Sequence, residues 1–113
     1  MIAIRDLQIG DFINTENNGV VQITVLSWRA VGYEGGASTP EHCSYIPLTE
    51  DILVKNGWRK EPITIDGDYA NWHGEIPICQ EEDEFNYERI ELIYVHQLQH
   101  LLRLCGIEKE IGL

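Results

Sequence analysis

A hairpin signal near the N-terminus constrains the fold of this chain more than any other feature. Residues 11–15 and 20–28 flank Asn17-Asn18-Gly19, and Asn-Gly supplies the two positive-φ residues that a tight hairpin turn requires. Apolar and polar residues alternate along the second stretch, which predicts one buried and one solvated face. The apolar members of that alternation are Val21, Ile23 and Val25. The chain therefore begins with antiparallel, half-buried strands.

Residues 49–56 carry signals for both ends of a short helix. Thr49 can accept hydrogen bonds from the first helical amides. Gly57 suits the left-handed residue that ends many helices, and Trp58 can then fold back onto Leu53. A second helix is expected over residues 95–105, where Val95, Leu98, Leu101, Leu102 and Cys105 fall on one stripe before Gly106.

The remaining segments read as short strands and loops. Residues 32–42 are rich in Gly, Ser, Thr and Pro and predict a loop or an irregular edge. Asp66-Gly67-Asp68 reads as a tight turn, and Pro77 predicts an edge position for its strand. Residues 88–94 alternate again, with Ile90, Leu92 and Tyr94 on one side.

Strands outnumber helices and come in hairpins rather than in alternating βαβ order, which predicts an α+β fold. We expect a single domain over residues 1–113, built on an antiparallel SH3-like barrel or curled sheet with one short and one C-terminal helix. The opening pattern from Leu7 to Ile13 looks like the first strand of SH3-like barrels. This pattern favours the SH3-like barrel among the two architectures.

Composition narrows the functional classes. The net charge of −11 opposes contact with nucleic acid phosphates. No apolar run is long enough to span a membrane, and the N-terminus does not read as a secretory signal. Cys43, Cys79 and Cys105 are far apart and odd in number, which favours reduced thiols and a cytoplasmic location.

Negative charge concentrates in one stretch. Residues 75–91 hold seven acidic residues against one base, for a net charge of −6. At its centre lie Glu81, Glu82, Asp83 and Glu84, which we take as candidate protein-binding residues for a basic partner. The run is also typical of a solvated turn. Trp72 is expected to be exposed and is the aromatic candidate for the same interface.

No catalytic, cofactor or metal site is expected. His96 and His100 have the spacing of a metal-binding pair, but two ligands are too few, and both are expected on the solvated side of the last helix. His42 adjoins Cys43 without an identifiable third group. No nucleophile-elbow, Walker-type or dinucleotide-binding glycine pattern occurs.

Three stretches resemble a known family. They are residues 6–13, residues 46–53 and Tyr94-Val95-His96-Gln97-Leu98-Gln99, together with Gly57-Trp58. These stretches are similar to a family of small uncharacterised proteins of Bacteroidetes genomes, their phages and integrated mobile elements. The resemblance implies a shared fold and a phage-like context, but no known activity.

Three functions stay open from the sequence. The first is a non-enzymatic phage or mobile-element accessory protein that binds a protein partner. The second is an acidic inhibitor that mimics nucleic acid and blocks a basic nuclease or host-defence protein. The third is a small metal-dependent enzyme that uses His96, His100 or the acidic run.

Overall fold

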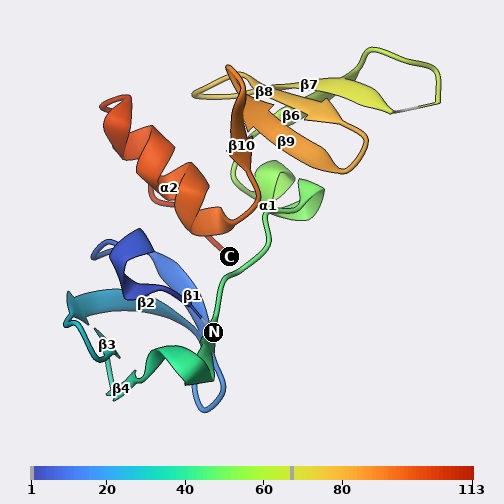
Figure 1. Cartoon of the computed structure of the whole chain (residues 1–113). Coiled ribbons are helices and arrows are strands. Elements are labelled where there is room, and N and C mark those ends of the chain that lie inside the picture. The colour runs from blue at the N-terminus through green and yellow to red at the C-terminus, as the bar shows by residue number, and fades with distance from the viewer. Residues whose placement is uncertain (1, 67) are drawn as a thin grey trace. The chain divides into compact units, whose positions relative to one another are not determined.

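The computed structural model describes residues 2–66 and 68–113. Their elements form two antiparallel five-stranded sheets and two α-helices (Figure 1). Sheet 1 has the order β4-β3-β2-β1-β5, and sheet 2 the order β10-β9-β8-β7-β6. By their contacts the residues fall into two compact units. Unit 1 takes the described part of Met1–Ile46 and Tyr94–His96, and unit 2 takes Pro47–Ile93 and Gln97–Leu113.

The elements have the following bounds. Unit 1 holds η1 (Ile4–Asp6), β1 (Phe12–Thr15), β2 (Gly19–Leu26), β3 (Val31–Tyr33), β4 (Gly36–Ser38), η2 (Pro40–His42) and β5 (Cys43–Ser44). Unit 2 holds α1 (Glu50–Lys55), β6 (Arg59–Pro62), β7 (Tyr69–His73), β8 (Ile78–Glu81), β9 (Glu84–Tyr87) and β10 (Ile90–Leu92). The last helix, α2, spans Val95–Leu104 and belongs to unit 2 from Gln97 onward.

The hairpin predicted near the N-terminus is present as β1 and β2, which pair from Phe12↔Gln22 to Thr15↔Gly19. Its turn differs from the expected one because only Gly19, at φ +66°, takes a positive φ. Thr15 stabilises the loop instead. Its hydroxyl accepts a hydrogen bond from the Asn18 amide and donates one to the Gly19 carbonyl. A single left-handed glycine after a three-residue loop is another common hairpin solution.

The apolar alternation predicted along β2 fails at Val25. The register of β2 against β3 shifts between Ile23 and Val25, so a bulge reverses the alternation there. Val25 is consequently 60% exposed, whereas Leu26 packs against the core of unit 1. That core gathers Ile2, Leu7, Ile13, Ile23, Val31 and Cys43.

For residues 32–42 the expectation of a loop is wrong in part, because the segment contains paired strands, whereas the alternative of a sheet edge fits β4, which is an edge strand of sheet 1. Strands β3 and β4 pair from Val31↔Ser38 to Tyr33↔Gly36 and leave a two-residue turn. Gly35 occupies that turn at φ +93°. The turn residues are Glu34 and Gly35, and a glycine with positive φ is common in two-residue hairpin turns.

The short helix α1 is capped at both ends as predicted. The Thr49 hydroxyl accepts a hydrogen bond from the Ile52 amide at 3.3 Å. At the other end Gly57 stands at φ +94°, and the Trp58 amide donates to the Leu53 carbonyl. This last bond closes a Schellman motif.

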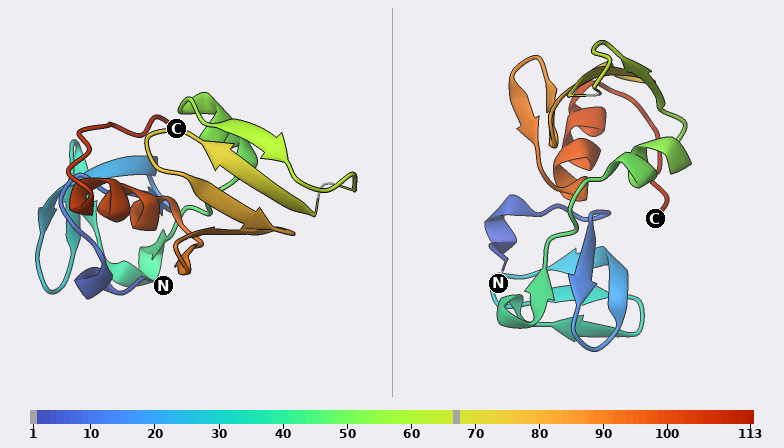
Figure 2. Two further views of the ribbon diagram at one scale, coloured as in Figure 1. Left: turned by 90° about the horizontal axis from the view of Figure 1, so that it is seen from above. Right: turned by 90° about the vertical axis from the view of Figure 1, so that its right-hand side faces the viewer.

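Sheet 2 is curled. The right-hand view of Figure 2 shows its strands following an arc, and Figure 1 shows β10 running across the direction of β7. The class predicted from sequence, α+β with a curled antiparallel sheet, one short helix and one C-terminal helix, is confirmed. The edge position expected for Pro77 is wrong, since β8 is the central strand. Pro77 precedes the first residue of β8, where its missing amide costs no ladder bond.

Helix α2 buries four of its five predicted stripe residues. Val95, Leu98, Leu101 and Leu102 are buried, and Gly106 at φ +72° ends the helix. Cys105 lies just beyond the helix and is exposed, contrary to expectation, because the chain has already turned there. No helix among residues 2–66 and 68–113 is long and apolar enough to cross a membrane. The expectation of one domain stays a prediction.

Candidate functional site

The acidic run predicted from sequence forms the turn between β8 and β9. Glu81 ends β8 and pairs with Glu84, the first residue of β9, while Glu82 and Asp83 make the turn. All four side chains are exposed. Glu82 stands at φ +55°, a left-handed conformation that glycine adopts at lower cost. The tight turn therefore fixes four carboxylates at one end of sheet 2.

Two further carboxylates, which the sequence reasoning did not connect with this run, lie beside it. The Glu82 amide donates to the Asp68 carbonyl at 2.5 Å, which brings Asp68 to the turn, and Asp66 interacts with Asp68. The negative charge of Asp66 and then that of Glu82 raise the pKa of Asp68. The Thr64 hydroxyl lowers the pKa of Asp66. Gly67, between them, lies outside the described residues, so the turn expected there stays a prediction.

A cleft of about 320 Å³ opens between the start of α1 and this turn. It is lined by Leu48, Thr49, Glu50, Asp51, Gln80, Asp83 and Phe85. Of its three carboxylates, Glu50 is partly neutralised because Lys60 Nζ lies 2.5 Å from Glu50 Oε1. Asp51 and Asp83 have no basic side chain among the other residues that line the cleft.

A second cleft of about 350 Å³ is bordered by the same turn. It is lined by Pro47, Leu48, Asp83, Glu84, Phe85, Glu91, Leu92 and Ile93. The two clefts share Leu48, Asp83 and Phe85. Leu48 and Phe85 are buried, so each cleft combines buried apolar side chains with exposed acidic ones. Ile93 is 47% exposed and offers apolar surface at the second cleft.

Residues distant in sequence meet at these clefts through backbone pairing. The Leu48 amide donates to the Ile93 carbonyl at 2.9 Å, which joins the segment before α1 to the segment after β10. Thr49 then starts α1 directly beside the turn of sheet 2. The sequence reasoning found the turn but missed this meeting, because only the long-range pairing creates it.

Trp72 is not exposed, and that expectation is wrong. The alternation of β7 places Ala70 and Trp72 on its buried side, and Trp72 is 1% exposed. Its indole N–H donates to Gln80 Oε1 at 2.8 Å, and its ring meets Phe85 edge-on at 6.4 Å. Gln80 and Phe85 both line the first cleft. Trp72 therefore contacts two residues that line the cleft and does not itself offer a contact surface.

His96 also departs from expectation. It is 4% exposed because the rings of Tyr45 and Tyr94 cover it, with centroids 4.7 Å and 5.8 Å away. His100, on the next turn of α2, is half-buried. Within residues 2–66 and 68–113, no group of three or more His, Cys, Asp or Glu side chains lies close enough to hold a metal ion.

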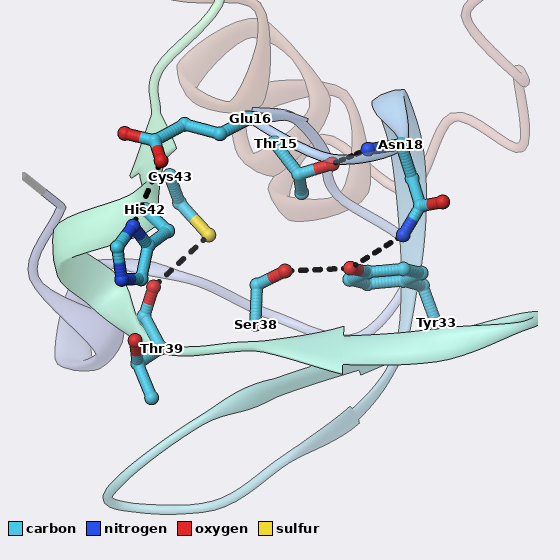
Figure 3. Close-up of polar contacts among 8 residues, drawn as sticks. All are labelled: Thr15, Glu16, Asn18, Tyr33, Ser38, Thr39, His42 and Cys43. Atoms are coloured by element: carbon cyan, nitrogen blue, oxygen red, sulfur yellow. Dashed lines mark hydrogen bonds and ion pairs between the residues drawn. The ribbon is translucent and has the colours of Figure 1, made fainter.

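Unit 1 holds a polar cluster around Tyr33 and His42 (Figure 3). The Tyr33 hydroxyl contacts Ser38 Oγ at 2.5 Å and accepts from Asn18 Nδ2 at 3.1 Å, and these bonds lower the pKa of Tyr33. His42 Nδ1 lies 2.8 Å from Glu16 Oε2. These contacts join the turns and strands of sheet 1 to one another.

The thiol in that cluster is not activated. Cys43 Sγ donates to the Thr39 carbonyl at 3.4 Å and does not face the His42–Glu16 pair (Figure 3). Burial, and then the charges of Glu16 and Glu41, raise the pKa of Cys43. A buried thiol with a raised pKa is a poor nucleophile at neutral pH. The cluster therefore stabilises unit 1 and does not form a Cys-His catalytic pair.

No family model, curated protein or solved structure shows a significant match to this chain.

Proposed function

We propose that this chain is a non-enzymatic accessory protein that acts by binding a basic protein partner at the two clefts of unit 2. The single observation that carries the proposal is the shared geometry of these clefts, in which Leu48, Asp83 and Phe85 belong to both. Every charged side chain among the described residues that line them is acidic. Their volumes fall at the lower end of the range for ligand pockets.

Charge and apolar surface contribute differently to such an interface. An exposed ion pair adds only about 0–1 kcal/mol, so the carboxylates mainly speed encounter and select basic partners. Affinity then depends on apolar area removed from water. Leu48 and Phe85 are already buried, whereas Ile93 still exposes 47% of its surface. Ile93 is therefore the residue whose removal should weaken binding without changing charge.

The context of the proposal comes from sequence. The resemblance over residues 6–13, 46–53 and 94–99 supports a role in a Bacteroidetes phage or integrated mobile element. A cytoplasmic location is part of the proposal, and it is supported by Cys43, Cys79 and Cys105, which are all unpaired thiols. Free exposed thiols such as Cys79 and Cys105 persist in a reducing compartment.

A sharper form of the same proposal is mimicry of nucleic acid. Asp66 and Asp68 lie next to Glu82 of the turn and add carboxylates that do not line the clefts. Repulsion among them raises the pKa of Asp68, as expected for closely spaced like charges. A nuclease or other DNA-binding protein of a host defence would meet this surface as it meets phosphates.

The test is affinity capture from a lysate of a Bacteroidetes host, followed by measurement with the purified partner. The cleft variant replaces Asp83, Glu84 and Glu91 with Asn or Gln. The control variant replaces Glu34, Glu108 and Glu110 with Gln, which removes the same charge from exposed positions outside the clefts. Circular dichroism checks that both variants keep the fold.

We expect the cleft variant and Ile93→Ser to lose a salt-sensitive basic partner that the control variant retains. Competition by duplex DNA would support the mimic, and no competition would favour an accessory role without mimicry. An equal loss of binding in the cleft and control variants would show that net charge, and not the clefts, determines binding. Retention of the partner by all variants would refute the assignment of the clefts.

A further inference from the structure

The turn between β2 and β3 in unit 1 presents a tryptophan to solvent. Trp28 is 78% exposed, whereas Trp58 and Trp72 are 2% and 1% exposed. Hydrogen bonds between Ser27 and Ala30 close the turn that carries Trp28. The Ser27 amide donates to the Ala30 carbonyl at 3.0 Å, and the Ser27 hydroxyl accepts from the Ala30 amide at 3.1 Å. The exposed indole is therefore carried by a hydrogen-bonded turn.

Trp28 borders an open, mainly apolar groove of about 570 Å³. The groove is lined by Ala3, Ile4, Arg5, Leu26, Ser27 and Trp28. Leu26 faces this side of β2 because of the bulge between Ile23 and Val25. The bulge that reverses the alternation of β2 therefore places the aliphatic side chain of Leu26 beside the indole of Trp28.

The groove also collects positive charge. The guanidinium of Arg29 stacks over the Trp28 ring at 3.9 Å from its centroid, and Arg5 lines the groove. These two residues are the whole Lys and Arg content of the described part of unit 1. The nearby carboxylate of Asp6 is turned to the Tyr45 hydroxyl at 3.3 Å and is not among the groove's lining residues.

We propose that this groove binds an acidic peptide segment of a partner protein. An aliphatic side chain of the segment fills the groove against Ile4 and Leu26 and meets the edge of Trp28. Flanking carboxylates of the segment pair with Arg5 and Arg29, where arginine suits bidentate contact. This surface lies in unit 1 and is independent of the acidic clefts of unit 2.

A peptide fits the groove better than single-stranded nucleic acid does. Sequence-tolerant binding of single strands uses a basic track and several aromatic platforms. The groove offers one exposed ring, one face of which carries Arg29, and its other walls are aliphatic. The net charge of −11 also opposes a long polyanion more strongly than a short segment.

Trp28 supplies the readout, because acrylamide reaches an exposed indole and quenches its fluorescence while Trp58 and Trp72 stay protected. The probe is a synthetic peptide with Leu set between Asp and Glu residues. The controls are the same peptide with Lys in place of the acidic residues, and a short oligothymidylate. The protein variants are Arg5→Gln, Arg29→Gln and the matched control Arg59→Gln, which removes an exposed base from unit 2.

We expect the acidic peptide alone to protect Trp28 from acrylamide in a saturable, salt-sensitive way. Each groove variant should weaken the affinity about two- to fivefold, which is the range for one exposed charge pair, and Arg59→Gln should leave it unchanged. Equal protection by the Lys peptide, stronger protection by oligothymidylate, no protection by any probe, or equal effects of the three variants would each overturn the proposal.

Discussion

Replacing Gly74 with alanine should destabilise unit 2 through one steric contact. A Cβ atom at this position would stand 2.4 Å from Trp58 Nε1 and 2.5 Å from its Cδ1. Trp58 is 2% exposed, and its indole N–H donates to the Ile76 carbonyl at 2.9 Å. Gly74 does not have a positive φ, so its backbone accepts alanine and the clash is the sole cause.

The expected cost combines three effects. Forcing extra volume against a packed indole costs about 1–3 kcal/mol. Moving the indole away from Ile76 leaves a buried polar group unpaired, at about 1–3 kcal/mol more. The lower entropy of the unfolded chain returns about 0.4–1 kcal/mol to the alanine variant. We therefore expect Gly74→Ala to lower the free energy of unfolding by about 1–5 kcal/mol.

Denaturant unfolding of four variants checks this reasoning. Gly112→Ala is the matched control, since its Cβ would meet only Asn56 Oδ1, at 3.8 Å. In a Trp58→Leu background the indole is gone, so Gly74→Ala should cost at least about 1 kcal/mol less than in the parent. A Gly74→Ala variant as stable as Gly112→Ala, or an equal cost in both backgrounds, would refute the steric account.

Three further predictions concern stability. Thr49→Ala should lower the free energy of unfolding, measured by urea unfolding, by about 0.5–2 kcal/mol, because it removes the N-cap hydrogen bond from the Ile52 amide. Arg89→Gly should raise the thermal midpoint of unfolding, because Glu88 and Arg89 both have positive φ, at 47° and 72°, in the β9–β10 turn. Asn-Gly is the preferred sequence for such a turn. An unchanged or lower midpoint would contradict this prediction. The pKa of the Cys43 thiol is raised from its ordinary value, first by burial. The stabilisation from the neutral thiol is therefore complete below the pKa of the unfolded thiol and is lost as the pH rises through the folded pKa. The stability advantage of wild type over Cys43→Ala in urea should therefore shrink between about pH 7 and pH 10.

The parts of the fold that follow from neighbouring residues could be predicted from the sequence. Helix α1 is the clearest case, because its N-cap at Thr49 and its left-handed Gly57 act within one helical turn. Gly106 ends α2 for the same local reason. The β1–β2 hairpin was found from Asn18-Gly19, although the loop uses one positive φ and not two.

Features that depend on long-range pairing could not be predicted in this way. The bulge of β2, which exposes Val25, arises from the register of β2 with β3. The alternation of apolar and polar residues in the sequence does not indicate it. The clefts need Leu48 beside Phe85, and the hydrogen bond from the Leu48 amide to the Ile93 carbonyl joins the two segments concerned. The wrong expectation of an exposed Trp72 has a different cause. The alternation of Ala70 and Trp72 with polar neighbours was readable, and it predicts their shared buried face.

The most direct test of the proposed function is an amide NMR titration with a synthetic peptide that carries Lys and Leu residues. The proposal predicts saturable, salt-sensitive shifts centred on Leu48, Asp83, Phe85 and Ile93, which are among the residues that line the clefts. The same titration of Ile93→Ser should show weaker binding at the same positions. Shifts spread evenly over exposed acidic residues such as Glu34 and Glu110, or shifts at the turn without Leu48 and Phe85, would contradict it.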